Sequence, residues 1–135
     1  MTVADRIALI ESFARAWTAR DVDALMALMA QDCEFKASIG PEPGTTFTGR
    51  ASVRQGYELF LGPGRPAGST TTEEEEMLVS EDFAVTRWTS RVSGSGPEGS
   101  PGSVDVVVRA CDIFEFTGDR ISRKDTYRKS VPPKL

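Results

Sequence analysis

The sequence contains no histidine among its 135 residues. Histidine is the commonest metal ligand and the commonest general acid or base in proteins, so its absence removes the usual route to both kinds of chemistry. Cysteine is also scarce: Cys33 and Cys111 are the two present, and no CxxC spacing relates them. We expect free thiols in a reducing cytosol, and we predict neither a cofactor nor a metal ion.

An excess of positive charge and long hydrophobic runs are lacking as well. The formal net charge is −4, whereas a nucleic-acid partner requires a basic patch to neutralise phosphates. No stretch approaches the roughly 20 apolar residues of a membrane span. The first ten residues carry Asp5 and Arg6 in a helical pattern, which is not typical of a signal peptide. The sequence therefore predicts a cytoplasmic protein with no nucleic-acid and no membrane partner.

The apolar pattern predicts helices first and strands afterwards. Thr2 and Asp21 are suited to cap two successive helices, and a third helix is expected from about Ala51 to Leu61. Strands are expected over Cys33–Ile39, Thr70–Ser80, Phe83–Val92, Val104–Phe116 and Ile121–Ser130. Helices grouped before an antiparallel meander predict an α+β fold, in which three helices pack on a curved, mainly antiparallel sheet. One domain over residues 1–130 and a tail over 131–135 are expected.

The last third of the chain is predicted to form two long strands around a Gly118-Asp119 turn. Side chains alternate between the two faces of a strand, so Arg109, Cys111 and Glu115 are expected on a polar face that lines a cavity. The opposite face carries Asp112 among apolar residues, and three short helices on the inner side cannot cover it. We therefore expect this apolar face to lie outside and to form a homodimer; its residues are Val104, Val106, Val108, Phe114 and Phe116.

Three segments carry a resemblance to a known family: ARDVDALMALMAQDCEF, FTGRASVRQGYELF and DIFEFTGDRISRKDTY. Together they resemble the SnoaL-like branch of the nuclear transport factor 2-like superfamily, over about Arg6 to Lys129. The resemblance implies a cone-shaped α+β barrel with an apolar pocket at its mouth. The superfamily also includes ketosteroid isomerases, limonene epoxide hydrolases, scytalone dehydratases and polyketide cyclases, so the fold by itself does not select a reaction.

The resemblance argues against several of these activities. Phe13, Ala37 and Arg109 stand where ketosteroid isomerases have their catalytic tyrosine and two aspartates, and none of them can do that proton chemistry. The Arg-x-Asp pair of limonene epoxide hydrolases reads Arg87-Trp88-Thr89, which lacks the carboxylate. Scytalone dehydratases rely on a histidine, which this chain does not have.

The SnoaL-like cyclases match better. Their acid/base aspartate matches Asp125, and their assisting histidine matches Cys111. The predicted catalytic residues are Asp125 as the base that removes a proton next to a carbonyl, with Arg109 or Tyr127 stabilising the enolate oxygen. A structural alternative is a buried ion pair between Asp125 and Arg109 or Arg87. The predicted substrate-binding residues are Trp17, Phe13, Ala37, Tyr57, Arg87, Thr89 and Cys111.

Two functions follow from these patterns. The first is a small cofactor-free enzyme that cyclises, isomerises or dehydrates a hydrophobic, carbonyl-bearing substrate such as a polyketide-like intermediate. The second is a non-catalytic ligand-binding or dimerisation module of the same fold. The enzyme is favoured because Asp125 matches the acid/base aspartate of the cyclases. The module is favoured because Phe13, Ala37 and Thr89 replace catalytic residues of related families.

Overall fold

The computed structural model of the chain describes residues 1–62, 70–92 and 106–129. Within these residues the helices are α1 (Val3–Thr18), α2 (Val22–Ala27) and α3 (Arg50–Leu61). Both predicted helix caps are confirmed. The Thr2 hydroxyl and the Asp5 carboxylate form a reciprocal capping box, and Asp21 Oδ1 accepts the backbone N–H of Ala24 at 3.0 Å.

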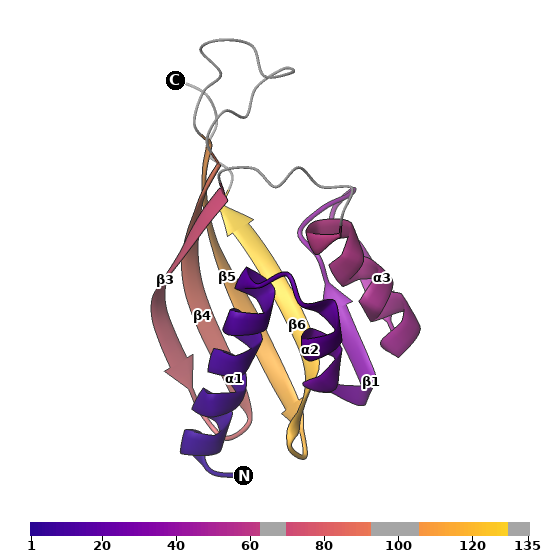
Figure 1. Cartoon of the computed structure of the whole chain (residues 1–135), viewed down its shortest axis with the longest axis vertical. Helices are drawn as coiled ribbons and strands as arrows, with labels where there is room; N and C mark the ends of the chain where they lie inside the picture. Colours follow the sequence, from indigo (N-terminus) through magenta and orange to yellow (C-terminus); the bar gives the residue numbers. More distant parts are fainter. Residues whose placement is uncertain (63–69, 93–105, 130–135) are drawn as a thin grey trace.

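The described strands form one six-stranded sheet in the order β2-β1-β6-β5-β4-β3 (Figure 1). Their bounds are β1 Met29–Lys36, β2 Thr46–Thr48, β3 Thr70–Val79, β4 Phe83–Val92, β5 Val106–Thr117 and β6 Arg120–Lys129. Strands β1 and β6 pair in parallel, and every other neighbouring pair is antiparallel. The predicted α+β class with a mainly antiparallel sheet is confirmed. The sheet curves but does not close into a barrel, because β2 and β3 each have a single described neighbour.

The strand boundaries differ from prediction mainly at the first strand. It begins at Met29 rather than Cys33, because Met29 is buried and pairs with Ile121 at the start of β6. The short strand β2 was not expected. The turn at Gly118-Asp119 between β5 and β6 is confirmed. Val104, Ser130 and the predicted tail over residues 131–135 lie outside the described residues.

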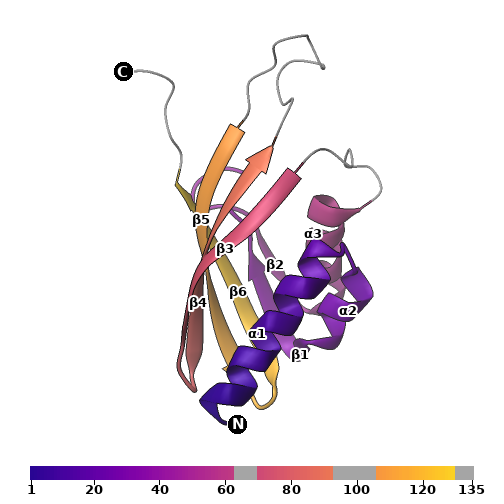
Figure 2. The same ribbon diagram turned by 60° about the vertical axis from the view of Figure 1, so that its left-hand side comes forward.

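All three helices lie on one side of the sheet (Figure 2). The core between these layers is aromatic: the Phe13 ring of α1 lies 5.2 Å from the Phe114 ring of β5, and the Trp17 ring lies 5.7 Å from the Tyr57 ring of α3. Phe114 is buried. The helices therefore pack on the face of β5 that includes Phe114.

This packing reverses the predicted orientation of the last two strands. Phe114 contacts α1, and the guanidinium of Arg6 lies over the Phe116 ring at 4.3 Å. The prediction that Phe114 and Phe116 form an outer, solvent-facing patch is therefore wrong. The physical reason is that the face with two phenylalanines offers the larger apolar area, and burying that area against the helices is the more favourable arrangement.

Arg6 fastens α1 to the sheet. Its Nε donates to the Glu81 carbonyl at 3.0 Å and its Nη1 donates to the Gly118 carbonyl at 2.6 Å. Glu81 lies in the turn between β3 and β4, and Gly118 in the turn between β5 and β6. One buried guanidinium thus joins two hairpin turns to the helix. Within the described residues, no helix is long and apolar enough to cross a membrane.

Candidate functional site

Six of the predicted site residues come together on the sheet face that the helices do not cover. Arg87, Cys111 and Tyr127 form one row across β4, β5 and β6, and Thr89 pairs with Arg109 in the next row. Asp125 pairs with Ile113 of β5 and Lys36 of β1. The remaining four predicted residues, Phe13, Trp17, Ala37 and Tyr57, belong to the helix-side core. The single cavity expected from the sequence is thus divided between two faces of the sheet.

The outer-face residues have their own partners. Arg87 forms an ion pair with Glu76 at 3.1 Å, and Arg109 Nη1 donates to the Thr89 hydroxyl at 3.3 Å. Burial raises the pKa of the Cys111 thiol, the nearby Asp112 and Asp125 raise it further, and Arg87 opposes the rise. A thiol with a raised pKa is a poor nucleophile at neutral pH because little thiolate is present.

The helix-side face of the sheet carries a polar cluster that sequence reasoning missed. Asp112 of β5 accepts hydrogen bonds from Lys124 Nζ at 3.2 Å and the Thr126 hydroxyl at 2.6 Å, both at Oδ1. Its Oδ2 accepts the indole N–H of Trp88 at 2.9 Å, and Lys124 Nζ also donates to the Thr126 hydroxyl at 2.8 Å. The side chains of Lys124 and Asp112 are 5% and 10% exposed. Among the described residues, no other ion pair has both side chains buried.

Aromatic rings enclose the ammonium of this pair. Lys124 Nζ lies 4.7 Å from the centre of the Trp17 ring and 4.8 Å from that of Phe35, which is within the range of cation–π attraction. The Tyr57 ring lies 4.9 Å from Phe35. Burial, followed by the influence of Cys33 and Asp112, raises the pKa of the Tyr57 phenol well above its usual value. Tyr57 therefore stays neutral in this interior.

The hydrogen bonds leave part of the Asp112 carboxylate available. A carboxylate offers about four lone-pair positions, of which two on Oδ1 and one on Oδ2 are used. Burial falls along β5 from Phe114 to Asp112 and then to half-buried Ala110. Half-buried Trp88 pairs with Ala110. Asp112 Oδ2, which accepts from Trp88, is thus the carboxylate oxygen with fewer partners.

One signal in the sequence could have located this cluster. Asp112 is two residues from Phe114, so both lie on the same face of β5, and the largest apolar residue of a strand usually marks its core side. Lys124 pairs with Phe114, and Thr126 pairs with Asp112. Anchoring the alternation on Phe114 would have placed all of them inside.

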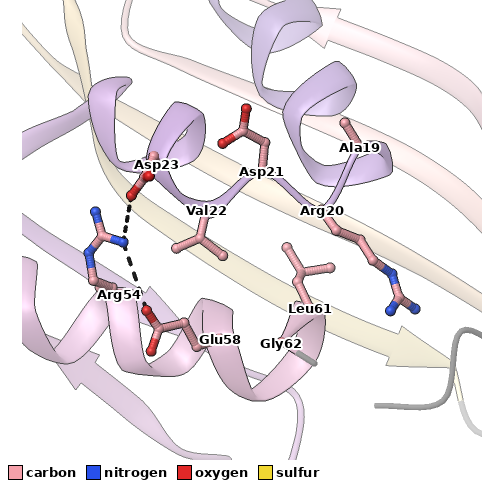
Figure 3. A pocket seen from close by; sticks show the side chains of 9 residues that line it. All are labelled: Ala19, Arg20, Asp21, Val22, Asp23, Arg54, Glu58, Leu61 and Gly62. Atoms are coloured by element: carbon pink, nitrogen blue, oxygen red, sulfur yellow. Dashed lines mark ion pairs between the residues drawn. The ribbon is translucent and has the colours of Figure 1, made fainter. Parts of the chain in front are cut away.

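Two surface depressions are lined by ion pairs, but none of these pairs is buried. The larger, about 570 Å³, lies where the end of α1 and α2 face α3 (Figure 3). Its Arg54 is neutralised by Asp23 at 2.8 Å and by Glu58 at 3.8 Å. The smaller, about 350 Å³, lies beside the pairs that Arg123 forms with Glu34 and Glu115. In the described part of the chain, no three Cys, Asp or Glu side chains are arranged to hold a metal ion.

Comparison with solved structures defines the class of the fold. A nuclear transport factor 2-like protein of unknown function from Mesorhizobium loti is 22% identical, with a TM-score of 0.75 over 95% of this chain and 93% of that one. A Kribbella flavida protein provisionally assigned to the ketosteroid isomerases is 17% identical, with a TM-score of 0.73 over 100% and 87%. An epoxide hydrolase/cyclase-like enzyme with a role in pyran ring formation in the polyether salinomycin is 16% identical, with a TM-score of 0.69 over 92% and 90%. The chain thus has a nuclear transport factor 2-like fold.

The family follows from the sequence model of the SnoaL-like domain, which matches residues 10–124. The chain belongs to the SnoaL-like domain family, so the predicted resemblance is confirmed. No curated protein matches the chain.

Proposed function

We propose that this protein is a cofactor-free SnoaL-like enzyme that performs acid/base chemistry on a hydrophobic, carbonyl-bearing small molecule, with Asp112 as the base. The observation that carries the proposal is the Asp112–Lys124 pair, buried between the sheet and an aromatic core. An isomerase-like and a cyclase-like protein among the structural neighbours are consistent with this class of chemistry. The two free cysteines agree with the cytoplasmic location that we infer.

The proposed step is proton abstraction next to a carbonyl. The C–H bond breaks, its proton moves to Asp112 Oδ2, and its electron pair is delocalised onto the carbonyl oxygen as an enolate. The enolate then reprotonates, cyclises or expels a leaving group. Thr126 and Trp88 hold the carboxylate in a fixed orientation, and Trp88 has to move off Oδ2 when a substrate enters.

Asp125 was predicted as the base from the family resemblance, and that role stays a prediction. Asp125 lies one strand position along from Lys124 and therefore points to the opposite face of β6. This relation makes Asp125→Asn a matched control for Asp112→Asn, since both replace a strand carboxylate by its isosteric amide.

The test is deuterium exchange at carbon next to a carbonyl, followed by NMR in D₂O with 2-tetralone and a 1,3-diketone as hydrophobic probes. Asp112→Asn should slow enzyme-dependent exchange by about 10²–10⁴-fold, the usual effect of losing a general base, and Asp125→Asn should not. Exchange lost only in Asp125→Asn would favour the outer-face site. Exchange that is no faster than in buffer with the wild type would contradict the enzyme proposal.

Folding has to be separated from catalysis in this test. Replacing Asp112 alone leaves a buried ammonium without its counter-charge, which can cost about 3–5 kcal/mol. The double variant Asp112→Asn/Lys124→Gln removes both charges and still lacks the base. Thermal melts of both variants show which of them is folded at the assay temperature.

The non-catalytic alternative is supported by a different surface. The helix-free face of the sheet exposes the apolar side chains Leu78, Phe83, Val107 and Tyr127. It also carries charges of both signs, such as Arg87 and Asp125. We propose that a second copy of this chain covers this face in a two-fold contact, because a surface with both signs of charge can complement itself.

A further inference from the structure

We infer that the interior site takes an uncharged carbonyl compound rather than a carboxylic acid or an amine, and that Lys124 is the counter-charge for the oxygen that becomes negative during the reaction. This inference rests on the proposed function, because it names the substrate class and a second acting residue at the same site. It follows from the charges around Asp112 and from the hydrogen bonds of Lys124.

The charges of the Asp112–Lys124 pair cancel each other. Asp112 contributes one negative charge and Lys124 one positive charge, at 3.2 Å. Tyr57, a buried titratable group of α3 whose pKa is influenced by Asp112, is neutral. Charge placed in such a dry, apolar environment without a partner is costly. A carboxylate ligand would face Asp112 and an ammonium ligand would face Lys124, whereas an uncharged ligand leaves the pair balanced.

The reaction moves the negative charge without creating a new one. When Asp112 accepts the substrate proton, its carboxyl becomes neutral and the enolate oxygen carries the charge instead. Lys124 keeps its positive charge throughout, so each state contains one anion and one cation. The ammonium can then release its hydrogen bond to Oδ1 and donate to the enolate oxygen.

The surroundings of Lys124 prepare it for this role. An ammonium has three N–H donors, and two of them bind Asp112 and Thr126. The Trp17 and Phe35 rings flank the ammonium and exclude water from it. A cation that is held in place and shielded from water stabilises a nearby developing anion far more strongly than a hydrated one.

The inference is tested by measuring how three probes of different charge bind to variants that lack one charge of the pair. The probes are naphthalene compounds of similar shape: 2-naphthamide, 2-naphthoate and 2-naphthylmethylammonium. The wild type should bind the amide at least as tightly as either ion, as measured by calorimetry. Asp112→Asn leaves a net positive site and should bind naphthoate about tenfold more tightly than the wild type does. Lys124→Gln leaves a net negative site and should shift affinity toward the ammonium probe by a similar factor.

Two sets of controls show whether a change in affinity arises at the Asp112–Lys124 pair. Glu115→Gln of β5 and Lys129→Gln of β6 make the same changes on the outer face of the sheet and should leave all three affinities unchanged. The double variant Asp112→Asn/Lys124→Gln should lose both ionic preferences. If a single variant does not fold, the wild-type order of affinities still decides: a wild type that prefers naphthoate or the ammonium probe overturns the inference.

The outcomes separate this inference from the proposed function. Deuterium exchange can fall in Asp112→Asn while the affinities of the three probes show no dependence on the charge of the probe. In that case the role of Lys124 is refuted and the base assignment stands. If the affinities follow charge but exchange persists in Asp112→Asn, the base assignment is refuted and the interior remains a binding site for uncharged ligands.

Discussion

Tyr57 shows how a single buried side chain affects the stability of this protein. Its phenol donates to Met29 Sδ at 3.4 Å, and burial raises its pKa well above the usual value. In the unfolded chain tyrosine ionises near pH 10 or so, whereas the folded state retains the proton. The folded state thus binds more protons in alkali, and the free energy of unfolding falls as the pH rises above about 10.

The prediction is that Tyr57→Phe weakens this alkaline loss of stability. Below about pH 9 the difference in unfolding free energy between the variant and the wild type should be constant. Above that pH the wild type should lose stability more steeply. Urea denaturation at a series of pH values measures both slopes. Tyr127→Phe, at an exposed tyrosine on the outer sheet face, is the control, and equal slopes for wild type and Tyr57→Phe would contradict the argument.

At the residue scale the sequence predicted the polar side chains but not the faces on which they lie. Strand periodicity correctly grouped Arg109 with Cys111 and Asp112 with Phe114. Which group faces the helices depends on the contact between Phe114 and Phe13, more than 100 residues apart in the chain, roughly the whole length of a small domain. Alternation has a period of two, so choosing the wrong face moves every side chain at once. That choice placed Asp125 in the predicted cavity and Asp112 outside it.

Helix α3 illustrates how an element is positioned by the absence of a side chain. Gly56 is buried in α3, and a methyl group there would lie 2.8 Å from Phe47 Cδ2 of β2 and 3.0 Å from Phe35 Cδ2 of β1. Those approaches are too short for ordinary packing. The helix therefore rests on the two aromatic rings at this point, and the Phe35 ring also lies 4.8 Å from Lys124 Nζ.

Gly56→Ala should consequently destabilise the protein. Alanine favours a helix over glycine by about 1 kcal/mol, but overpacking of a tight contact costs about 1–3 kcal/mol. We expect a net loss of unfolding free energy and a lower melting temperature. Gln55→Ala, at an exposed neighbour in α3, should be neutral or stabilising. A Gly56→Ala variant that gains stability would show that the rings can shift without cost.

Elements were predicted well where local chemistry specifies them. Thr2 and Asp21 cap helices by short-range hydrogen bonds, and these bonds depend only on neighbouring residues. The parallel pairing of β1 with β6 joins opposite ends of the chain and left no local signal. The three-residue strand β2 is too short to show alternation. Tertiary contacts therefore decide the features that were missed.

In the described part of the molecule, the helices cover one face of the sheet, and no described helix covers the other, which is called the uncovered face (Figure 2). The helices and the aromatic core fill one side, where Asp112 and Lys124 lie. The other side is left with apolar side chains between charged ones, including half-buried Val85 and Ile113 and exposed Leu78. Monomers rarely leave a contiguous apolar patch of this kind in water. The expected homodimer therefore remains a proposal, although the residues that form its interface differ from those first predicted.

The dimer is tested by a pair of matched leucines. Leu78, on β3 at the uncovered face, is 57% exposed, and Leu59, on α3, is 58% exposed. Because the two leucines are equally exposed, an aspartate at either position should lower the unfolding free energy of the isolated chain by a similar amount. A difference in oligomeric state between the variants therefore reports association. Sedimentation equilibrium at micromolar concentration should give a dimer for the wild type and for Leu59→Asp, and a folded monomer for Leu78→Asp. A monomeric wild type would remove the proposal, and a dimer that persists in Leu78→Asp but dissociates in Leu59→Asp would place the contact on the helices.

If Leu78→Asp is monomeric yet keeps the exchange activity, the uncovered face serves assembly and the enclosed face serves chemistry.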